Sequence, residues 1–365
     1  MKLNMRFMAG NIIDDILYFS HLQFNGLFRM RLDTEEMTFI GSFDEVPESR
    51  ASIHRKCLVY DRWLIFIPHN FNKVHFINAD TLEQKTVTVA EDNGKVMIAD
   101  AVIWKDSLYI LPARKEQPVV IIHLNDLCVE YPKAFNDWIG TSVPDSPHKS
   151  GILATGAELF DDCIFLGLYY QNTIIKYDLK SESGSLVDTG IENIMGVFAG
   201  NSCLWVTDAE NGLIERLPDH EKNIEDDRKK TYRRVLSSGE YVYAIPGKAG
   251  RIKLMEGVGS SKEMEYPDEY KDIESLNVNS KFFGYAIYKG YIYLFPYSHD
   301  NILVIHEGGL NVLHTEYEVD TKDPASEQFV KLLNMRGNHL LSINGTIRES
   351  STFPLEAYVE WIRSV

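Results

Sequence analysis

The stretch KDSLYILP, residues 105–112, decides the fold because similar stretches recur along the chain. Each copy opens with a tight polar turn and continues with aromatic and aliphatic residues, a composition typical of β-strands. The first aliphatic residue of each copy follows that of the previous copy by 38 to 56 residues, close to the length of a propeller blade. The eight copies are DDILYFS from Asp14, DRWLIFIP from Asp61, KDSLYILP from Lys105, DDCIFLG from Asp161, GNSCLWV from Gly200, GEYVYAIP from Gly239, KGYIYLFP from Lys289 and GNHLLSI from Gly337.

A second turn residue follows each copy and introduces another β-rich run. Asparagine and glycine tolerate a left-handed backbone, so these positions predict hairpins. A further β-run precedes each copy and a weaker one follows several of them, so each unit is predicted to hold four strands. The second turn residues are Asn25, Asn72, Gln117, Asn172, Asn211, Gly250 and Asn301, with Asn344-Gly345 in the eighth unit.

Four copies end in proline, at Pro68, Pro112, Pro246 and Pro296. With the hairpin asparagines, this pattern resembles the bacterial β-propeller repeat proteins whose second strand carries a Leu-Tyr-Ile-Leu-Pro-like motif. The Gly-His and Trp-Asp marks of WD repeats and the paired glycines of kelch repeats are absent. The resemblance covers nearly the whole chain and implies a propeller without implying an activity.

We therefore expect an all-β fold, a single propeller domain over residues 1–365 with eight four-stranded blades. The final segment, TFPLEAYVEWIRSV, is predicted to be a short helix that caps the last blade, because Pro354 suits a first helical turn. This helix replaces the last unit's outer strands, so seven blades with an appended unit is the alternative. The predicted repeat units are 1–46, 52–92, 96–135, 151–190, 193–220, 232–258, 280–318 and 328–365.

The chain carries a formal net charge of −16, which excludes some classes of partner. An acidic surface repels the phosphates of nucleic acids and anionic membranes, so neither is expected to bind. The four cysteines lie far apart beside apolar runs and are predicted to be buried free thiols. The N-terminus lacks a signal-peptide pattern, so the sequence predicts a soluble, cytoplasmic protein.

Loop lengths point to one face of the propeller. The loops between second and third strands and the connections between blades are longer than the first hairpins, and they share one face. Aromatic, amide and charged side chains on these loops suit a sugar or a peptide, although ordinary solvated loops look the same. The candidate binding residues are His69, Phe71, Tyr169, Tyr170, Asp208, Glu210, Tyr297, His299 and Trp138.

No motif in the sequence specifies a reaction. His21, His69 and His299 fall in comparable loops but have no local ligand spacing, so neither a metal site nor a cofactor is predicted. The first hypothesis is a non-catalytic binding or scaffolding propeller that engages a protein or a carbohydrate through its long-loop face. The alternative is a carbohydrate-active or lactone-hydrolysing enzyme with its site at the mouth of the central channel. Polar residues converging there from several blades would favour the alternative.

Overall fold

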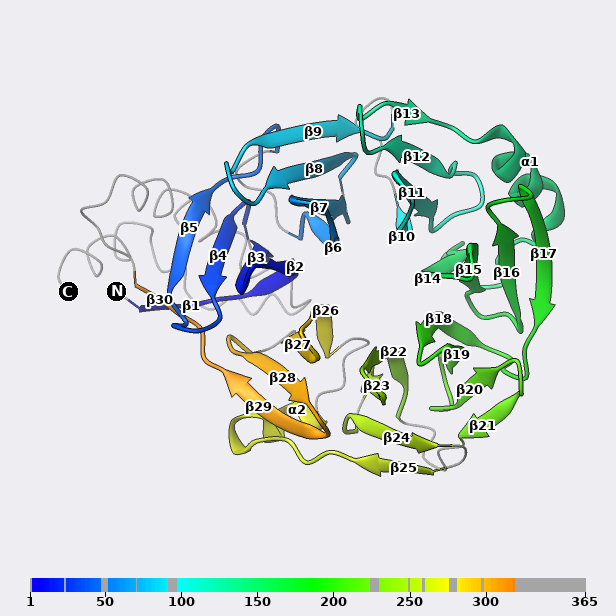
Figure 1. Ribbon diagram of the computed structural model, residues 1–365. Coiled ribbons are helices and arrows are strands. Elements are labelled where there is room, and N and C mark those ends of the chain that lie inside the picture. Colours follow the sequence, from blue (N-terminus) through cyan, green and yellow to red (C-terminus); the bar gives the residue numbers. More distant parts are fainter. Residues whose placement is uncertain are drawn as a thin grey trace, which may run out of the picture.

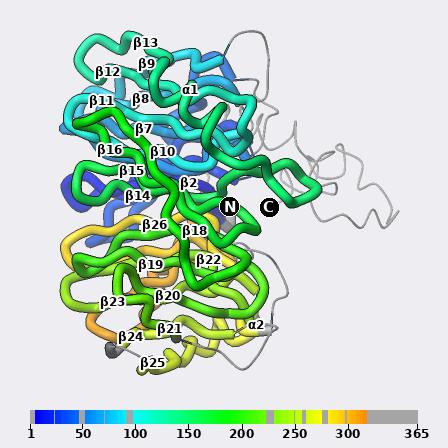
Figure 2. The backbone as a smooth tube through the Cα atoms, turned by 90° about the vertical axis from the view of Figure 1, so that its right-hand side faces the viewer, coloured from blue at the N-terminus to red at the C-terminus, as the bar shows by residue number. Residues whose placement is uncertain are grey.

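The computed structural model shows a seven-bladed β-propeller in which four-stranded antiparallel sheets surround a central axis (Figure 1). A side view shows the connection that follows helix α1 standing out from one face of the ring (Figure 2). The residues that the structure describes are 2–22, 24–46, 52–69, 71–90, 97–223, 230–248, 250–257, 260–275, 281–296 and 299–318.

Each blade contributes one strand to each of four concentric positions. The innermost strands are β2 (Phe7–Ile13), β6 (His54–Tyr60), β10 (Ile98–Trp104), β14 (Ala154–Phe160), β18 (Ile194–Gly200), β22 (Tyr232–Ser238) and β26 (Phe282–Tyr288). The second strands are β3 (Ile16–His21), β7 (Trp63–Pro68), β11 (Ser107–Pro112), β15 (Cys163–Leu168), β19 (Cys203–Asp208), β23 (Tyr241–Pro246) and β27 (Tyr291–Pro296). The third strands are β4 (Leu27–Arg31), β8 (Lys73–Asn78), β12 (Val120–His123), β16 (Thr173–Asp178), β20 (Ile214–Leu217), β24 (Lys253–Gly257) and β28 (Ile302–His306). The outer strands are β5 (Met37–Gly41), β9 (Gln84–Thr88), β13 (Val129–Glu130), β17 (Ser183–Asp188), β21 (Glu221–Asn223), β25 (Ser260–Glu263) and β29 (Gly309–Leu313).

The sequence repeat that predicted the propeller corresponds to the first hairpin of each blade. Asp14 and Asp15 have φ angles of 50° and 61°, and Asp161 and Asp162 have φ angles of 48° and 58°. Positive φ at both central residues is the signature of a type I′ turn, whose twist matches that of the flanking strands. Aspartate, asparagine and glycine accept this conformation, so the copies open with such residues.

The second strands are buried on both faces because each sheet packs against two neighbouring blades. In β7, β11 and β27 every residue after the first is buried. Such strands need apolar side chains on both sides, which explains why the sequence shows continuous apolar runs there.

The ring closes after seven blades, so the predicted preference for eight is wrong. The ring centroid of Phe7 on β2 lies 5.7 Å from that of Phe295 on β27, and the first and seventh blades are therefore in contact. Strand β1 (Lys2–Asn4) also pairs antiparallel with β30 (Glu316–Glu318). No space is left for an eighth blade between the first and seventh blades. The copy from Gly337 and the predicted terminal helix lie outside the described residues.

Helix α1 (Lys133–Ser142) was not predicted from the sequence, and a short helical pair, η1 (Asp268–Tyr270) and α2 (Lys271–Ser275), lies in the polar segment 257–280. Helix α1 lies on the outside of the fourth blade, where the Phe135 ring stacks on Tyr177 at 3.6 Å. The polar segments 218–232 and 257–280 supply the outer strands β21 and β25. No helix among the described residues has the length and apolar character needed to cross a membrane.

Candidate functional site: a cationic cavity in the central channel

All seven innermost strands carry a β-bulge close to their first residues. In β6 the pairing with β7 skips Arg55, and in β22 the pairing with β23 skips Arg233. A bulge re-aims the side chains around it. Consecutive residues, such as Arg55 with Lys56, can therefore both line the channel.

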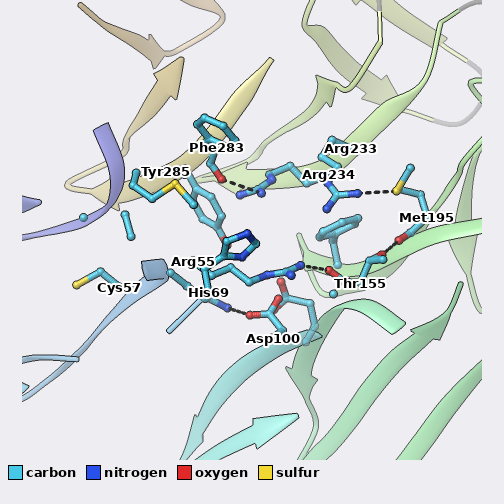
Figure 3. A pocket seen from close by; sticks show the side chains of 18 residues that line it. Arg55, Cys57, His69, Asp100, Thr155, Met195, Arg233, Arg234, Phe283 and Tyr285 are labelled. Atoms are coloured by element: carbon cyan, nitrogen blue, oxygen red, sulfur yellow. Dashed lines mark hydrogen bonds and ion pairs between the residues drawn. The ribbon is translucent and has the colours of Figure 1, made fainter. Parts of the chain in front are cut away.

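The bulges lie at the long-loop end of the channel, because His54 at the start of β6 pairs with Pro68 at the end of β7. A cavity of about 180 Å³ lies at this end (Figure 3). It exceeds the ~150 Å³ of an engineered cavity that holds benzene, so a small organic molecule fits. All seven innermost strands and His69 line it. Its polar side chains are Arg55, Lys56, His69, Asp100, Thr155, Glu158, Arg233, Arg234 and Tyr285, and its larger apolar ones are Met8, Met195, Phe198 and Phe283.

Lys56 and Asp100 form an ion pair in the lining of the cavity, with Nζ and Oδ1 2.8 Å apart. Burial opposes the charge on each group. The attraction between them prevails and raises the pKa of Lys56, and Lys56 and Arg55 together lower the pKa of Asp100. Asp100 also accepts the backbone N–H groups of Ala101 at 2.8 Å and Ala157 at 3.3 Å. The Asp100 charge is therefore already compensated by the protein.

Arg55 ties three blades together across the channel. Its Nη1 donates to the carbonyl of Ile98 at 2.9 Å, and its Nη2 donates to the carbonyl of Thr155 at 2.5 Å. Burial lowers the pKa of Arg55, and Asp100 opposes this effect. Because carbonyl oxygens carry only partial charge, they do not neutralise Arg55, and its guanidinium can still bind an anion.

Arg233 has the weakest set of partners among these cations. Its Nη1 donates to Sδ of Met195 at 2.8 Å, and no other hydrogen bond from its side chain is seen within the described part of the chain (Figure 3). A thioether is a weak acceptor, whereas a guanidinium has five N–H donors. Burial, followed by repulsion from Arg55 and Arg234, lowers the pKa of Arg233 to about 9.

Arg234 is held more firmly than Arg233. Its Nη2 donates to the carbonyl of Phe283 at 3.3 Å, and its guanidinium lies 4.9 Å from the centre of the Tyr285 ring. The aromatic face stabilises the cation without neutralising it.

Glu158 is the second carboxylate of the cavity and differs from Asp100. Burial raises the pKa of Glu158 to about 7, and Lys56 opposes that rise. Among the described residues, none donates a hydrogen bond to its carboxylate. Nearby, burial and then Arg55 lower the pKa of His69 to about 4, so this imidazole is neutral at pH 7.

The structure places the predicted binding residues in several different surroundings. His69 lines the cavity, and Tyr169 is close enough to Arg233 to interact with its charge. The rings of Tyr169 and Tyr170 meet edge to face, with their centroids 4.6 Å apart, and both pack against His148. Phe71 packs beside His75 in the core between the first two blades.

The remaining predicted residues lie away from the cavity. Asp208 is buried and caps its own loop by accepting the N–H groups of Glu210 and Asn211, each at 2.6 Å, while Glu210 is exposed. His299 pairs with Asp272 at 2.9 Å. Trp138 on α1 packs over the outer strand β17, and Tyr297 lies outside the described residues. Their binding role stays a prediction.

Within the described ranges, no group of three or more histidine, cysteine, aspartate or glutamate side chains is arranged to hold a metal ion. The cavity's strongest charges are cationic, a character that suits an anion. Sequence reasoning missed every polar side chain of the cavity except His69. A usable signal was present: Arg55-Lys56 and Arg233-Arg234 are basic pairs at the same place in two repeat units, just inside the predicted innermost strand.

Comparison with known proteins supports the fold alone. No protein-family model matches the chain, and no curated protein matches its sequence. Among solved structures, the extracellular domain of a putative one component system from B. thetaiotaomicron is similar with a TM-score of 0.55 and 11% identity, over 85% of this chain and 38% of that one. PorZ, a surface component of the type-IX secretion system of Porphyromonas gingivalis, gives 0.57 and 9%, over 86% and 39%. A chain of the mitotic checkpoint complex gives 0.56 and 8%, over 84% and 91%.

Proposed function

We propose that this propeller binds a small organic anion in the cavity at the long-loop end of its central channel. The observation that carries the proposal is Arg233, a charged guanidinium among other cations. Within the part of the chain that the structure describes, its side chain has a thioether as its one hydrogen-bond partner. A carboxylate, sulfate or phosphate group would supply the acceptors that this side chain lacks.

The local charge supports an anion. Four cations, Arg55, Lys56, Arg233 and Arg234, face two carboxylates, one of which has a pKa of about 7. The cavity is therefore positive within a chain whose formal net charge is −16. An acidic exterior slows the approach of anions, so the surface of this protein does not steer them towards the channel. The cations inside the channel therefore favour the binding of an anion that has already entered.

The apolar part of the lining supports an organic ligand. Met8, Met195, Phe198 and Phe283 form walls between the charged groups. Small-molecule sites commonly combine apolar walls with a few polar groups that fix orientation. A sugar acid, a dicarboxylate or a phosphorylated metabolite has both kinds of surface.

The test is isothermal titration calorimetry with tartrate and with sulfate, two dianions that stay fully ionised near neutral pH. We expect saturable binding to the wild-type protein and a loss of at least tenfold in affinity in Arg233→Met. Arg31→Gln is the matched control, because it removes the same charge from an exposed position paired with Asp33. If neither dianion binds, or if both variants lose affinity equally, the channel is not the anion site.

A second candidate function rests on Glu158. A carboxyl group with a pKa of about 7 in a cavity is suited to general acid–base catalysis. Hydrolysis of a lactone would give a carboxylate product that the cations favour. Glucono-δ-lactone in a pH-stat tests this candidate: acceleration by the wild-type protein that Glu158→Gln abolishes supports it, and no acceleration contradicts it.

The propeller neighbours include binding and scaffolding proteins, and we retain a protein or glycan partner at the long-loop face as a separate proposal. The aromatic cluster of His148, Tyr169 and Tyr170 beside the cavity supports it. Cytoplasmic location likewise stays a prediction of the sequence.

A further inference from the structure

We propose that the channel site takes up a dianion together with one proton, and that Glu158 is the residue that receives this proton. The inference rests on the anion-binding function proposed above and adds the class of ligand and its coupling to pH.

The position of Glu158 is the first argument. Glu158 on β14 lines the same cavity as Lys56 from β6, Asp100 from β10, Arg234 from β22 and Tyr285 from β26. All four of these groups interact electrostatically with its carboxylate. The Nζ of Lys56 is already engaged by Asp100 at 2.8 Å and by the Ala101 carbonyl at 3.1 Å. The Glu158 carboxylate thus lies among charged groups, but none of the described residues donates a hydrogen bond to it.

The second argument is the arrangement of the cations along the channel. Arg55 and Arg233 are the bulge residues, and Lys56 and Arg234 follow them directly, one residue farther from the long-loop end. Successive residues of a strand advance by about 3.3 Å. The two pairs therefore present positive charge at two depths, which favours a ligand with two negative charges over a single carboxylate.

The third argument is the repulsion that such a ligand creates. A second anionic group placed near Lys56 and Arg234 lies close to Glu158, and like charges at short range inside a protein disfavour ionisation of both. Protonation removes this repulsion, and the neutral carboxyl group becomes a hydrogen-bond donor to the ligand. By thermodynamic linkage, ligand binding promotes proton uptake to the same degree that protonation promotes ligand binding.

Calorimetry in two buffers of different ionisation enthalpy, HEPES and Tris, measures the protons taken up for each dianion that binds. At about pH 8, where Arg233 is still mostly protonated, we expect the wild-type protein to take up close to one proton per tartrate or sulfate. Binding should weaken roughly tenfold between about pH 7.5 and pH 8.5. Lactate, a monoanion of similar chemistry to tartrate, should bind at least tenfold more weakly than tartrate and take up less than half a proton.

Glu158→Gln should abolish proton uptake and hold the affinity for dianions constant between about pH 6 and pH 8. Glu116→Gln, at an exposed loop position paired with Arg114, should behave as wild type. If Glu158→Gln does not fold, the wild-type proton count still decides. Dianion binding that depends on Arg233 but takes up no proton overturns this inference and leaves the proposed function intact, whereas absence of dianion binding overturns the proposed function itself.

Discussion

Replacing Arg233 by methionine should stabilise the fold while it abolishes anion binding. Burial and repulsion from Arg55 and Arg234 lower the pKa of the guanidinium to about 9, well below that of an unperturbed arginine. Each pKa unit corresponds to about 1.4 kcal/mol, so keeping this charge in the cavity costs up to ~5 kcal/mol of folding free energy. Solvent in the cavity screens part of this cost, and the bond to Met195 is lost in the variant. We therefore expect a gain of about 2 kcal/mol in Arg233→Met.

Urea denaturation at pH 7, with and without tartrate, measures both effects. Without tartrate, the midpoint of Arg233→Met should exceed that of the wild-type protein, because repulsion from Arg55 and Arg234 is relieved. With tartrate, only the wild-type protein should gain stability, in proportion to the logarithm of ligand concentration. A destabilised Arg233→Met would refute the reasoning, since it would mean that Arg233 is a structural element rather than a group held for a ligand.

Two further predictions concern the frame around the site. His75 is buried and shares a hydrogen bond with His54 at 3.0 Å, and burial lowers the pKa of His75 to about 4. The unfolded chain therefore binds a proton at this histidine more readily than the folded protein does. As a result, the free energy of unfolding falls as the pH drops below about 6.5. Between pH 7 and pH 5, the free energy of unfolding of the wild-type protein, measured by urea titration, should fall by about 2 kcal/mol more than that of His75→Gln. The control is His123→Gln, at an exposed histidine, which should behave as wild type. An equal fall in the wild-type protein and His75→Gln would contradict the assignment. Gly184→Ala should lower the Tm by several degrees, because a Cβ at this position overlaps the Trp138 ring. An unchanged Tm would show that the packing of α1 against β17 does not contribute to stability.

The propeller was predictable because each blade repeats the same local chemistry. Type I′ turn residues and doubly buried second strands leave a clear mark in the sequence, as at Asp14-Asp15 and in KDSLYILP. The number of blades was not predictable by counting copies, because closure depends on contacts between distant segments. The contact of Phe7 with Phe295 and the pairing of β1 with β30 are decided by the curvature of the whole ring.

The charged residues of the site could not be predicted from the sequence, because binding residues are usually found on loops. Here the charged residues lie within strands. A charged residue in an innermost strand is indistinguishable in sequence from one on a solvated edge unless the strand's position in the blade is known. His69 is predictable as a binding residue because it follows the second strand and lies on a loop, whereas Arg55 and Asp100 fall within predicted β-runs.

The bulges explain why the cavity can hold so many charges. A regular innermost strand alternates its side chains between the channel and neighbouring blades, so two adjacent charged residues would place one of them in an apolar core. The bulges in β6 and β22 remove that conflict, because the extra residue lets Arg55 and Lys56, and Arg233 and Arg234, share the channel. In β2, β18 and β26, by contrast, the bulge residues are Met8, Met195 and Phe283, which supply apolar walls. The bulge thus recurs in all seven innermost strands and gives a ring of equivalent positions around the channel. Each blade can carry a different side chain there, and the four cations come from two blades.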